Sequence, residues 1–459
     1  MLDNYHRCYY NSREEIFKIL LKDKAVIVLN YKEAVDYIEE TPKFTTKNSL
    51  DHTKECLRRL GNPQERFRVI HVAGTNGKGS VCAFLASMLR EGGYRCGLFT
   101  SPHLVKINER FQMDEIMVDD ETFLSAFLKV KKLADDLVAE GSYHPTYFEM
   151  LFLMGMVIFA DAGMEYVVLE TGLGGRLDAT NSIDDPLACV ITSISLDHMQ
   201  YLGNTVREIA GEKAGIIQPG IPVVYDANDS DAAEVIAKKA KELGSPAWPL
   251  TEAAPSSEAD RQGISFEMEL GHFGKQKFQI PFIAKYQVMN ARLALTCMDV
   301  LAEELPLSLE QMKAGIANTR WQGRMETIAP GIIVDGAHNE DGVRRFVETA
   351  AHFQKKYPVT LLFSAVSDKD YQDMIREMCE AIAFRHVVTT EVGGYREVPA
   401  EELAEIFRQN GCESVSAFSQ IPKAYEEAVA KKGEDGMLFC AGSLYLVGEI
   451  KTYLQSQKQ

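Results

Sequence analysis

The stretch HVAGTNGKGS, residues 71–80, decides how the rest of the chain is interpreted. The apolar run 69–72 leads into it, and apolar residues spaced for one helical face follow it over 81–89. This order predicts a strand, a tight loop and a helix. Glycines in such a loop let the backbone turn so that successive N–H groups meet phosphate oxygens, and the positive end of the helix dipole adds to the attraction. The stretch therefore predicts a phosphate-binding site.

Lys78 and Ser80 make this loop more specific than an ordinary glycine-rich turn. Lys78 can place a cation on the outer phosphates of a nucleotide, and Ser80 can offer its hydroxyl to a magnesium ion. The usual pattern has the lysine directly before the serine, whereas Gly79 separates them here. A turn without a ligand is the alternative, but the lysine, the serine and the flanking elements together favour nucleotide binding. The predicted nucleotide-binding residues of the loop are Gly74, Thr75, Asn76, Gly77, Lys78, Gly79 and Ser80.

Length and composition limit the possible classes of protein. A chain of 459 residues with 46% apolar and 25% charged residues predicts a globular protein of two domains. The formal net charge of -17 disfavours a broad nucleic-acid or anionic-membrane surface. The nine cysteines include no CxxC pair, no stretch is long enough to span a bilayer, and the N-terminus does not resemble a signal peptide. We therefore expect reduced thiols in a cytoplasmic protein.

Strands that alternate with helices predict an α/β fold, with a doubly wound and mostly parallel sheet. A β-rich segment is expected over 252–283, and a second, smaller Rossmann-like α/β domain after it. We place the boundary at residue 320, so that 1–320 form the first domain, with 1–30 as an N-terminal extension, and 321–459 the second. First-domain strands are expected within 66–72, 95–99, 166–169, 188–194 and 223–224, and second-domain strands at 332–334, 359–363, 386–389 and 437–440.

Polar clusters follow several of these strands, at 74–80, 100–103, 170–181 and 197–198. Ligands bind at the carboxyl ends of the strands in such sheets, so the clusters predict one shared site. Glu170 is a candidate ligand for the nucleotide's magnesium, with a solvated loop glutamate as the alternative. His198 would lie near Glu170 on the neighbouring strand, although a structural histidine is the more frequent case and magnesium prefers oxygen.

Three further positions are ambiguous from the residues alone. Lys213, in the run AGEKAG, is expected to pair with Glu212 or with solvent. The clusters 335–339 and 441–443 end strands of the second domain, where an ordinary turn is the alternative to a ligand site. If the two domains face each other, these clusters line the far wall of a cleft.

The motifs, taken in order, resemble the folylpolyglutamate synthase/dihydrofolate synthase family, within the Mur ligase superfamily. The matching pieces are GTNGKGS (74–80), SPHL (101–104), ETGLGGRLDATN (170–181), DH (197–198), GEKAGII (211–217), YQxxNA (286–291), WxGR (321–324), DGAHN (335–339), DKD (368–370) and GSLY (442–445). Single pieces are shared with other Mur ligases, whereas SPHL together with ETGLGGRLDATN is specific to the folate branch. Departures occur at Gln322 and Glu340, where proline is common, and at Tyr286, which often corresponds to a histidine.

The resemblance implies an ATP-dependent ligase that phosphorylates a pteroate or folate carboxylate and joins L-glutamate to it through an amide. It implies two Mg²⁺ ions, one held by Ser80 and Glu170 and one by Glu170, His198 and a carbamylated Lys213. It also implies a catalytic set of Lys78, Glu170, His198, Lys213 and His338. The remaining implied contacts are Asn290, Arg324 and Asp335 for ATP, His338 and Ser443 for glutamate, and Ser101, Pro102, His103, Phe148 and Asp178 for the pterin.

Two other functions remain open from the sequence. One is a Mur-type amino-acid ligase that acts on a UDP-linked sugar acid, which would not account for SPHL. The other is a P-loop binding module without catalysis. Under the favoured interpretation the partners are small molecules, namely ATP, L-glutamate and folate or dihydropteroate, and the protein is a monomer without nucleic-acid or membrane partners.

Overall fold

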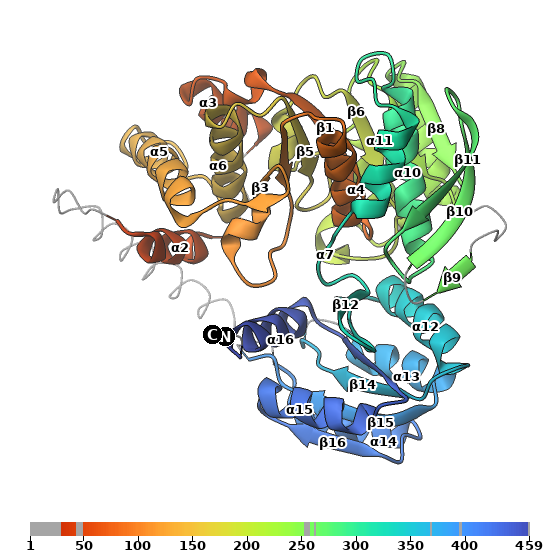
Figure 1. Ribbon diagram of the computed structural model, residues 1–459. Coiled ribbons are helices and arrows are strands. Elements are labelled where there is room, and N and C mark those ends of the chain that lie inside the picture. Colours follow the sequence, from red (N-terminus) through yellow and green to blue (C-terminus); the bar gives the residue numbers. More distant parts are fainter. Residues whose placement is uncertain are drawn as a thin grey trace.

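The computed structural model describes residues 29–42, 49–251, 258–260, 263–367, 370–393 and 397–457. Two α/β lobes, each built on its own sheet, lie one above the other in Figure 1. Almost all of the expected N-terminal extension, 1–30, lies outside the described residues, as do the first two residues of the DKD motif. Within the described part of the chain, no helix is both long enough and apolar enough to cross a membrane.

The first lobe contains an eight-stranded sheet in the order β4-β3-β2-β5-β1-β6-β7-β8. In this spatial order, all neighbouring strands from β2 to β8 pair in parallel. β3 and β4, at one edge, form antiparallel pairs. The predicted doubly wound, mostly parallel sheet is confirmed. Its strands are β1 (Arg68–Ala73), β2 (Cys96–Phe99), β3 (Phe111–Met113), β4 (Ile116–Met117), β5 (Tyr166–Glu170), β6 (Ala188–Ile191), β7 (Val223–Asp226) and β8 (Ala247–Leu250).

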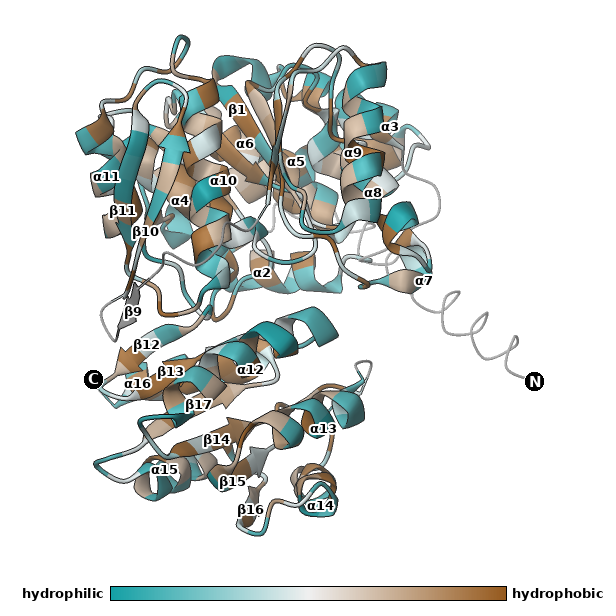
Figure 2. Ribbon diagram, turned by 90° about the vertical axis from the view of Figure 1, so that its right-hand side faces the viewer, coloured by the Kyte–Doolittle hydropathy of each residue, from teal (hydrophilic) through white to brown (hydrophobic). Residues whose placement is uncertain are grey.

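Helices cover both faces of this sheet, which explains why central strands such as β5 and β6 carry near-continuous apolar runs rather than alternating ones. Within β5, Val168 packs into the core beneath α4, whereas Val167 and Leu169 pack into the core beneath α6. Figure 2 shows the apolar residues gathered between these layers and the polar ones on the outer helix faces. The helices are α2 (Tyr31–Glu40), α3 (Leu50–Arg59), α4 (Lys78–Glu91), α5 (Asp120–Ala139), α6 (Tyr147–Asp161), α7 (Met199–Leu202), α8 (Val206–Ala214), α9 (Ser230–Glu242), α10 (Tyr286–Val300) and α11 (Leu309–Asn318).

A small antiparallel sheet stands beside α10 and α11 (Figure 1). It comprises β9 (Glu258–Asp260), β10 (Gly263–Leu270) and β11 (Gly274–Ile280). Every second residue of β10, from Ile264 to Leu270, is buried in the core that α4 shares. This alternation is the period of a half-buried strand, and the expected β-rich segment is confirmed over its described residues.

The second lobe has a six-stranded sheet in the order β12-β13-β17-β14-β15-β16. All four expected strands are present, and β12 and β16 are additional. The strands are β12 (Glu326–Ala329), β13 (Ile332–Val334), β14 (Val359–Phe363), β15 (Phe384–Thr390), β16 (Val415–Phe418) and β17 (Met437–Ala441). The helices are α12 (Glu340–Gln354), α13 (Tyr371–Ala381), α14 (Ala400–Gln409), α15 (Ile421–Lys432) and α16 (Leu444–Ser456). Residue 320 lies between α11 and β12, and the division into domains at that residue stays a prediction.

One expectation about strand neighbours is wrong. β6, which precedes His198, was expected beside the strand of Glu170, but β1 lies between β5 and β6 in the sheet. Parallel α/β sheets place strands out of chain order, so chain order alone could not settle this adjacency.

Candidate active site

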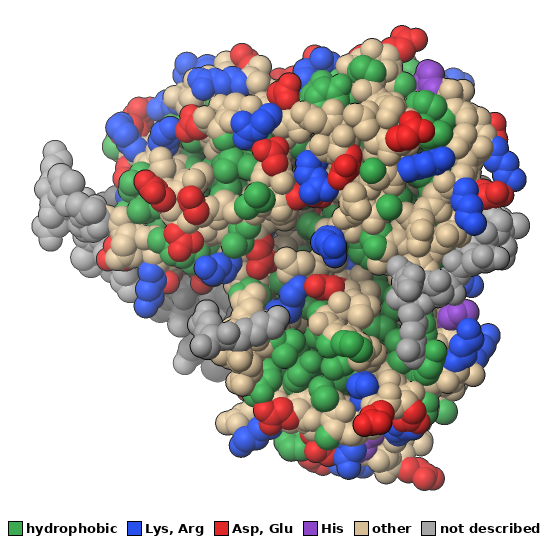
Figure 3. All heavy atoms as spheres, in the orientation of Figure 1, with side chains coloured by type: hydrophobic (Ala, Val, Ile, Leu, Met, Phe, Trp, Pro, Cys, Tyr) green, Lys and Arg blue, Asp and Glu red, His purple; other side chains and the backbone are tan. Residues whose placement is uncertain are grey.

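A cavity of about 1410 Å³ lies where the two lobes face each other. Figure 3 shows charged side chains of both signs along this junction. The first lobe contributes the glycine loop, the SPHL loop, the segment after β5, Asp197, His198 and Lys213, and the second lobe contributes Arg324, His338, Asn339 and Ser443. Segments far apart in the sequence thus converge on one space, at the carboxyl ends of the strands.

The glycine loop connects β1 to α4 in a conformation that needs glycine. Gly74 and Gly77 have φ angles of 150° and 90°, which L side chains rarely adopt. A side chain at Gly74 would also collide with Thr192, and one at Gly77 with Asn290. The loop is therefore packed tightly from behind, and its backbone lines the cavity just before the first residue of α4, Lys78.

Three predicted residues meet beside this loop. The Nζ atom of Lys78 lies 3.9 Å from Oε1 of Glu170 and donates to the carbonyl of Thr75 at 3.2 Å. Glu170 is 3% exposed, and its other oxygen accepts the Ser101 N–H at 3.0 Å. Burial raises the pKa of Glu170, and the Lys78 charge opposes that shift. The buried Ser80 hydroxyl accepts from the Gln287 amide at 3.2 Å, so a hydroxyl and a carboxylate stand ready at one end of the loop.

Lys213 lies at the end of α8, where the sequence alone favoured solvent or Glu212 as its partner. That expectation is wrong, because Lys213 is 4% exposed and donates to the carbonyl of Gly74 at 2.7 Å, while Glu212 pairs with Arg176. Desolvation, followed by the nearby Lys78 charge, lowers the pKa of Lys213 to about 7. The amine is therefore largely neutral just above neutral pH, which is the form that can react with an electrophile.

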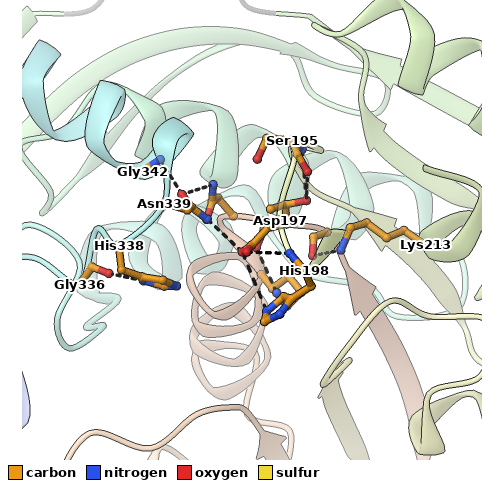
Figure 4. Close-up of polar contacts among 12 residues, drawn as sticks. Ser195, Asp197, His198, Lys213, Gly336, His338, Asn339 and Gly342 are labelled. Carbon is orange, nitrogen blue, oxygen red and sulfur yellow. Dashed lines mark hydrogen bonds and ion pairs between the residues drawn. The ribbon is translucent and has the colours of Figure 1, made fainter. Parts of the chain in front are cut away.

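His198 lines the same cavity as Lys213, and its side chain is far more exposed than that of Lys213. Its side chain is 48% exposed, its backbone has a φ of 50°, and its Nε2 lies 4.0 Å from an oxygen of Asp197. In Figure 4, Asp197 and Asn339 point toward each other from facing lobes, with His198 below them. His198 and Glu170 line the same cavity although they follow non-adjacent strands.

Asn339 joins the lobes through hydrogen bonds. Its amide nitrogen donates to Asp197 at 3.1 Å and to Asn76 at 3.3 Å, while its oxygen caps α12 by accepting the Gly342 N–H at 2.8 Å. Nδ1 of the preceding His338 lies 2.7 Å from the Gly336 carbonyl. A carbonyl can only accept, so Nδ1 carries a proton and the lone pair of the neutral ring is on Nε2. Ser443, buried at the start of α16, accepts from the N–H of Tyr445.

A second, smaller cavity of about 70 Å³ opens on the other side of the glycine loop. Its lining includes Gly77, Ser80, Asn290, Arg324 and Asp335. Asp335 is buried and accepts the N–H groups of Met325 and Ala337, and burial raises its pKa against the opposing charge of Arg324. Tyr286 places its hydroxyl 3.4 Å from the same carboxylate. The predicted ATP residues outside the loop therefore gather at this cavity.

The residues predicted for the pterin fall into two groups. Ser101, Pro102 and His103 line the large cavity, but Phe148 and Asp178 are not in its lining. The Phe148 ring leaves no room for a side chain at Gly172, and Asp178 accepts the N–H groups of Gly172 and Leu173 at 3.0 and 2.8 Å. Both residues therefore support the segment after Glu170 from behind.

Sequence analysis missed Arg110, a buried cation in the cavity wall. Its Nε donates to Nδ1 of His103 at 3.0 Å, and another nitrogen lies 3.3 Å from the Tyr147 hydroxyl. Burial lowers the pKa of Arg110. It comes shortly after SPHL in the sequence, but its polar neighbours gave no sign that the side chain would be buried.

The donor set suits magnesium better than a transition metal. No group of three His, Cys, Asp or Glu side chains that could hold a metal ion occurs among the residues that the structure describes. Mg²⁺ takes only one or two protein carboxylates and completes its shell with water and phosphate oxygens. The buried Glu170 carboxylate and the Ser80 hydroxyl, both in the lining of the large cavity, fit that requirement.

Comparisons with known proteins agree along most of the chain. The Mur ligase middle domain matches residues 72–298, and the Mur ligase, glutamate ligase domain matches residues 323–444. The dihydrofolate synthase/folylpolyglutamate synthase of Bacillus subtilis (strain 168) is 35% identical over 433 residues, covering 93% of this chain and 99% of that protein. The folylpolyglutamate synthase of Lacticaseibacillus casei is 32% identical over 441 residues, covering 94% and 100%.

Comparison with solved structures points to the same family. The solved structure of E. coli FolC in complex with DHPP and ADP has a TM-score of 0.81 and 26% identity, and the match covers 94% of this chain and 99% of that one. Relatives above 30% identity that match nearly end to end share more than a general architecture. The chain belongs to the folylpolyglutamate synthase/dihydrofolate synthase family of Mur ligases.

Proposed function

We propose that this protein is an ATP-dependent ligase that adds L-glutamate to folate and to dihydropteroate. The observation that carries the proposal is the large cavity between the lobes. It joins a phosphate-binding loop and a buried carboxylate in the first lobe to a histidine and a serine in the second. The relatives named above for both synthase activities support the same assignment.

The reaction would proceed in two transfers. First, a carboxylate oxygen of the folate or pteroate substrate attacks the γ-phosphorus of ATP, the bond to the β–γ bridging oxygen breaks, and ADP leaves. The amine nitrogen of glutamate then attacks the acyl carbon of the acyl phosphate, inorganic phosphate leaves, and an amide remains. Phosphorylation is needed because a carboxylate is a poor electrophile.

The first-lobe residues would act on the triphosphate. Backbone N–H groups of residues 76–79 bind phosphate oxygens at the N-terminus of α4, while the Thr75 N–H already donates to the Ser193 carbonyl, and Lys78 neutralises charge that develops during transfer. Asn290 contacts the adenine, while Arg324 and Asp335 reach the nucleotide from the second lobe, since all three line the smaller cavity beside the loop.

Two Mg²⁺ sites would complete this end of the cavity. Ser80 and Glu170 would hold one ion, and Glu170, His198 and a carbamylated Lys213 would hold the other. When bound, the ions would supply positive charge against the phosphate oxygens. Carbamylation replaces a cation with an oxygen anion: the neutral amine of Lys213 attacks CO₂, an N–C bond forms, and a proton is released to solvent. The deep burial of Lys213 beside Gly74 supports this proposal, since burial keeps the amine neutral.

The second-lobe residues would receive glutamate. His338 and Ser443 lie in the cavity lining, and the tautomer of His338 leaves its Nε2 able to accept a proton from the glutamate ammonium group. Ser101, Pro102 and His103 border the pterin directly, with Phe148 and Asp178 supporting the adjacent segment. These residues need no partner subunit to complete the site, and a monomer is part of the proposal. A cytoplasmic location is proposed as well, because most of the described cysteines are buried and all of the described ones are free thiols.

The test is a substrate panel with ATP and L-glutamate in every reaction. Phosphate release and an added glutamyl mass are expected with tetrahydrofolate and with dihydropteroate. Product with only one of them would restrict the protein to that activity. Turnover with a UDP-linked sugar acid and with neither pterin would overturn the assignment in favour of another Mur-type ligase. ATP binding without turnover on any acceptor would indicate a binding module.

A further inference from the structure

Two cysteines of the second lobe face each other across a helix pair. Cys379 lies in the last turn of α13, and Cys412 lies shortly after the end of α14. Their sulfur atoms are 3.5 Å apart although the residues are 33 positions apart in the sequence. The two helices are in contact, so the packing of α13 on α14 brings the thiols together.

Exposure separates this pair from the other cysteines. Among the cysteines in the described residues, Cys379 and Cys412 are the two that are partly exposed, and the rest are buried. Of the described thiols, this pair is therefore the one that lies nearest to solvent. A metal is a weaker explanation, because no third His, Cys, Asp or Glu ligand joins the two thiols within the described part of the chain.

We propose that Cys379 and Cys412 are a reversible oxidation site that a small-molecule disulfide, such as oxidised glutathione, converts to an intramolecular disulfide. The Cys412 thiolate attacks one sulfur of the reagent, and the first glutathione thiolate leaves. The Cys379 thiolate then attacks the Cys412 sulfur of the mixed disulfide, and the second glutathione leaves. Two protein thiols lose two electrons and two protons, and one disulfide reagent becomes two thiols.

The two sulfur atoms already lie near each other. A disulfide requires its sulfurs to approach to about 2.05 Å, so the observed pair must close by about 1.5 Å. The Cys379 thiol lies within hydrogen-bonding distance of Cys412 and lowers the pKa of that thiol, which makes Cys412 the better first nucleophile. The same contact raises the pKa of Cys379.

The disulfide would reach the cavity through α13. The helix face formed by Asp373, Met374, Arg376, Glu377 and Glu380 lines the large cavity. A bond at Cys379 would fix the C-terminal turn of this wall to the segment after α14. The oxidation state of a pair outside the cavity lining would thereby set how freely one wall of the cavity moves.

The decisive experiment is peptide mapping of the full chain after native incubation with oxidised glutathione. Trypsin should yield the peptide 377–385 linked to the peptide 409–423, with a mass two hydrogens below their sum, and a reductant should separate them. The Cys412→Ser variant should lose the linked product and retain at most one glutathione on Cys379. The Cys297→Ser variant, which removes a buried thiol, is the matched control and should still form the linked product.

A second measurement, which does not use enzyme activity, tests whether the disulfide restricts the motion of α13. Hydrogen exchange of the peptide 377–385 is expected to slow by about tenfold on oxidation, because a cross-link restricts local opening. Unmodified thiols, or stable glutathione adducts without the linked peptides, would overturn the proposal. Neither measurement depends on the proposed ligase function. The proposed oxidation site and the proposed ligase function can therefore fail separately.

Discussion

The large cavity has two ends, which differ in whether their candidate site residues already contact one another in the folded chain. At the inner end, Ser80 and Glu170 are buried, with Glu170 only 3% exposed, and Lys78 already pairs with Glu170. The outer end, formed by His198 and Lys213, is not connected. The His198 side chain is 48% exposed, and Lys213 is turned onto the carbonyl of Gly74.

This difference follows from the elements that carry the residues. β1 and β5 are adjacent parallel strands, and Val72 pairs directly with Glu170, so the sheet register fixes the inner end. His198 stands at the start of the four-residue helix α7, after a loop beyond β6, and Lys213 lies at the end of α8. A sheet thus preorganises one end, whereas no strand pairing positions His198 and Lys213 at the other.

The largest effect is expected when the inner end is broken. Replacing Lys78 with alanine should reduce ATP-dependent glutamate addition by more than about 10³-fold, because the cation nearest the transferred phosphoryl group is lost. The measurement is phosphate release under saturating substrates. Lys132→Ala, which removes a lysine whose side chain is 78% exposed on α5, is the control and should leave the rate unchanged. Activity of Lys78→Ala within tenfold of wild type would contradict a preorganised inner end.

A second large effect is expected at Lys213. Lys213→Met should reduce turnover by about 10²-fold or more, because no carbamate can form. Wild-type protein given ¹³C-labelled bicarbonate should show a carbamate carbon signal that Lys213→Met lacks. Lys451→Met, which removes a partly buried lysine paired with Glu326, is the matched control. A wild type that has no carbamate signal and is fully active without bicarbonate would show that the outer end needs no modification.

The lowered pKa of Lys213 also predicts a pH dependence of stability in bicarbonate-free buffer. The unfolded chain holds this proton up to about pH 10.4, whereas the folded chain releases it above about 7. The unfolded state therefore binds more protons between those values, so stability should rise with pH across that window. Urea unfolding at several pH values should show this slope in wild type and a flatter one in Lys213→Met.

The placement of Glu170 beside the glycine loop could be predicted from the sequence for a physical reason. Strand, glycine loop and helix are local in the chain, and each leaves a periodic or compositional pattern. Glu170 could be placed beside the loop because polar residues at strand ends gather at one edge of a parallel sheet. The conformations of Gly74 and Gly77 follow from the same local pattern.

The outer end could not be predicted in the same way. Burial of Lys213 depends on how α8 packs against the loop and the segment after β5, and no local pattern encodes that packing. The order of β5, β1 and β6 is likewise a property of the whole sheet. Only the family resemblance pointed to Lys213 as more than a surface lysine, and its role in the site stays a prediction.

A smaller effect is expected at His198, because an exposed ligand that solvent can replace contributes less than a buried one. His198→Ala should raise the Mg²⁺ concentration for half-maximal activity by on the order of tenfold, with a smaller change in the maximal rate. His272→Ala is the control, since its side chain is similarly exposed at 49% and pairs with Asp299 in the small sheet region. An effect of His198→Ala as large as that of Lys78→Ala would mean that both ends are equally essential.

The smallest effect on catalysis is expected behind the inner end, at Asp178. Its carboxylate accepts N–H groups of Gly172 and Leu173, so Asp178→Asn should lower the free energy of unfolding by about 1–3 kcal/mol by facing an amide N–H₂ toward those donors. The KM for folate should change by less than about threefold, because Asp178 is not in the lining of the cavity. Asp229→Asn is the control, since asparagine caps a helix as well as aspartate does and the cap of α9 should survive. A KM raised more than tenfold with unchanged stability would instead place Asp178 against the substrate, and the preorganised end of the cavity would then extend to the pterin.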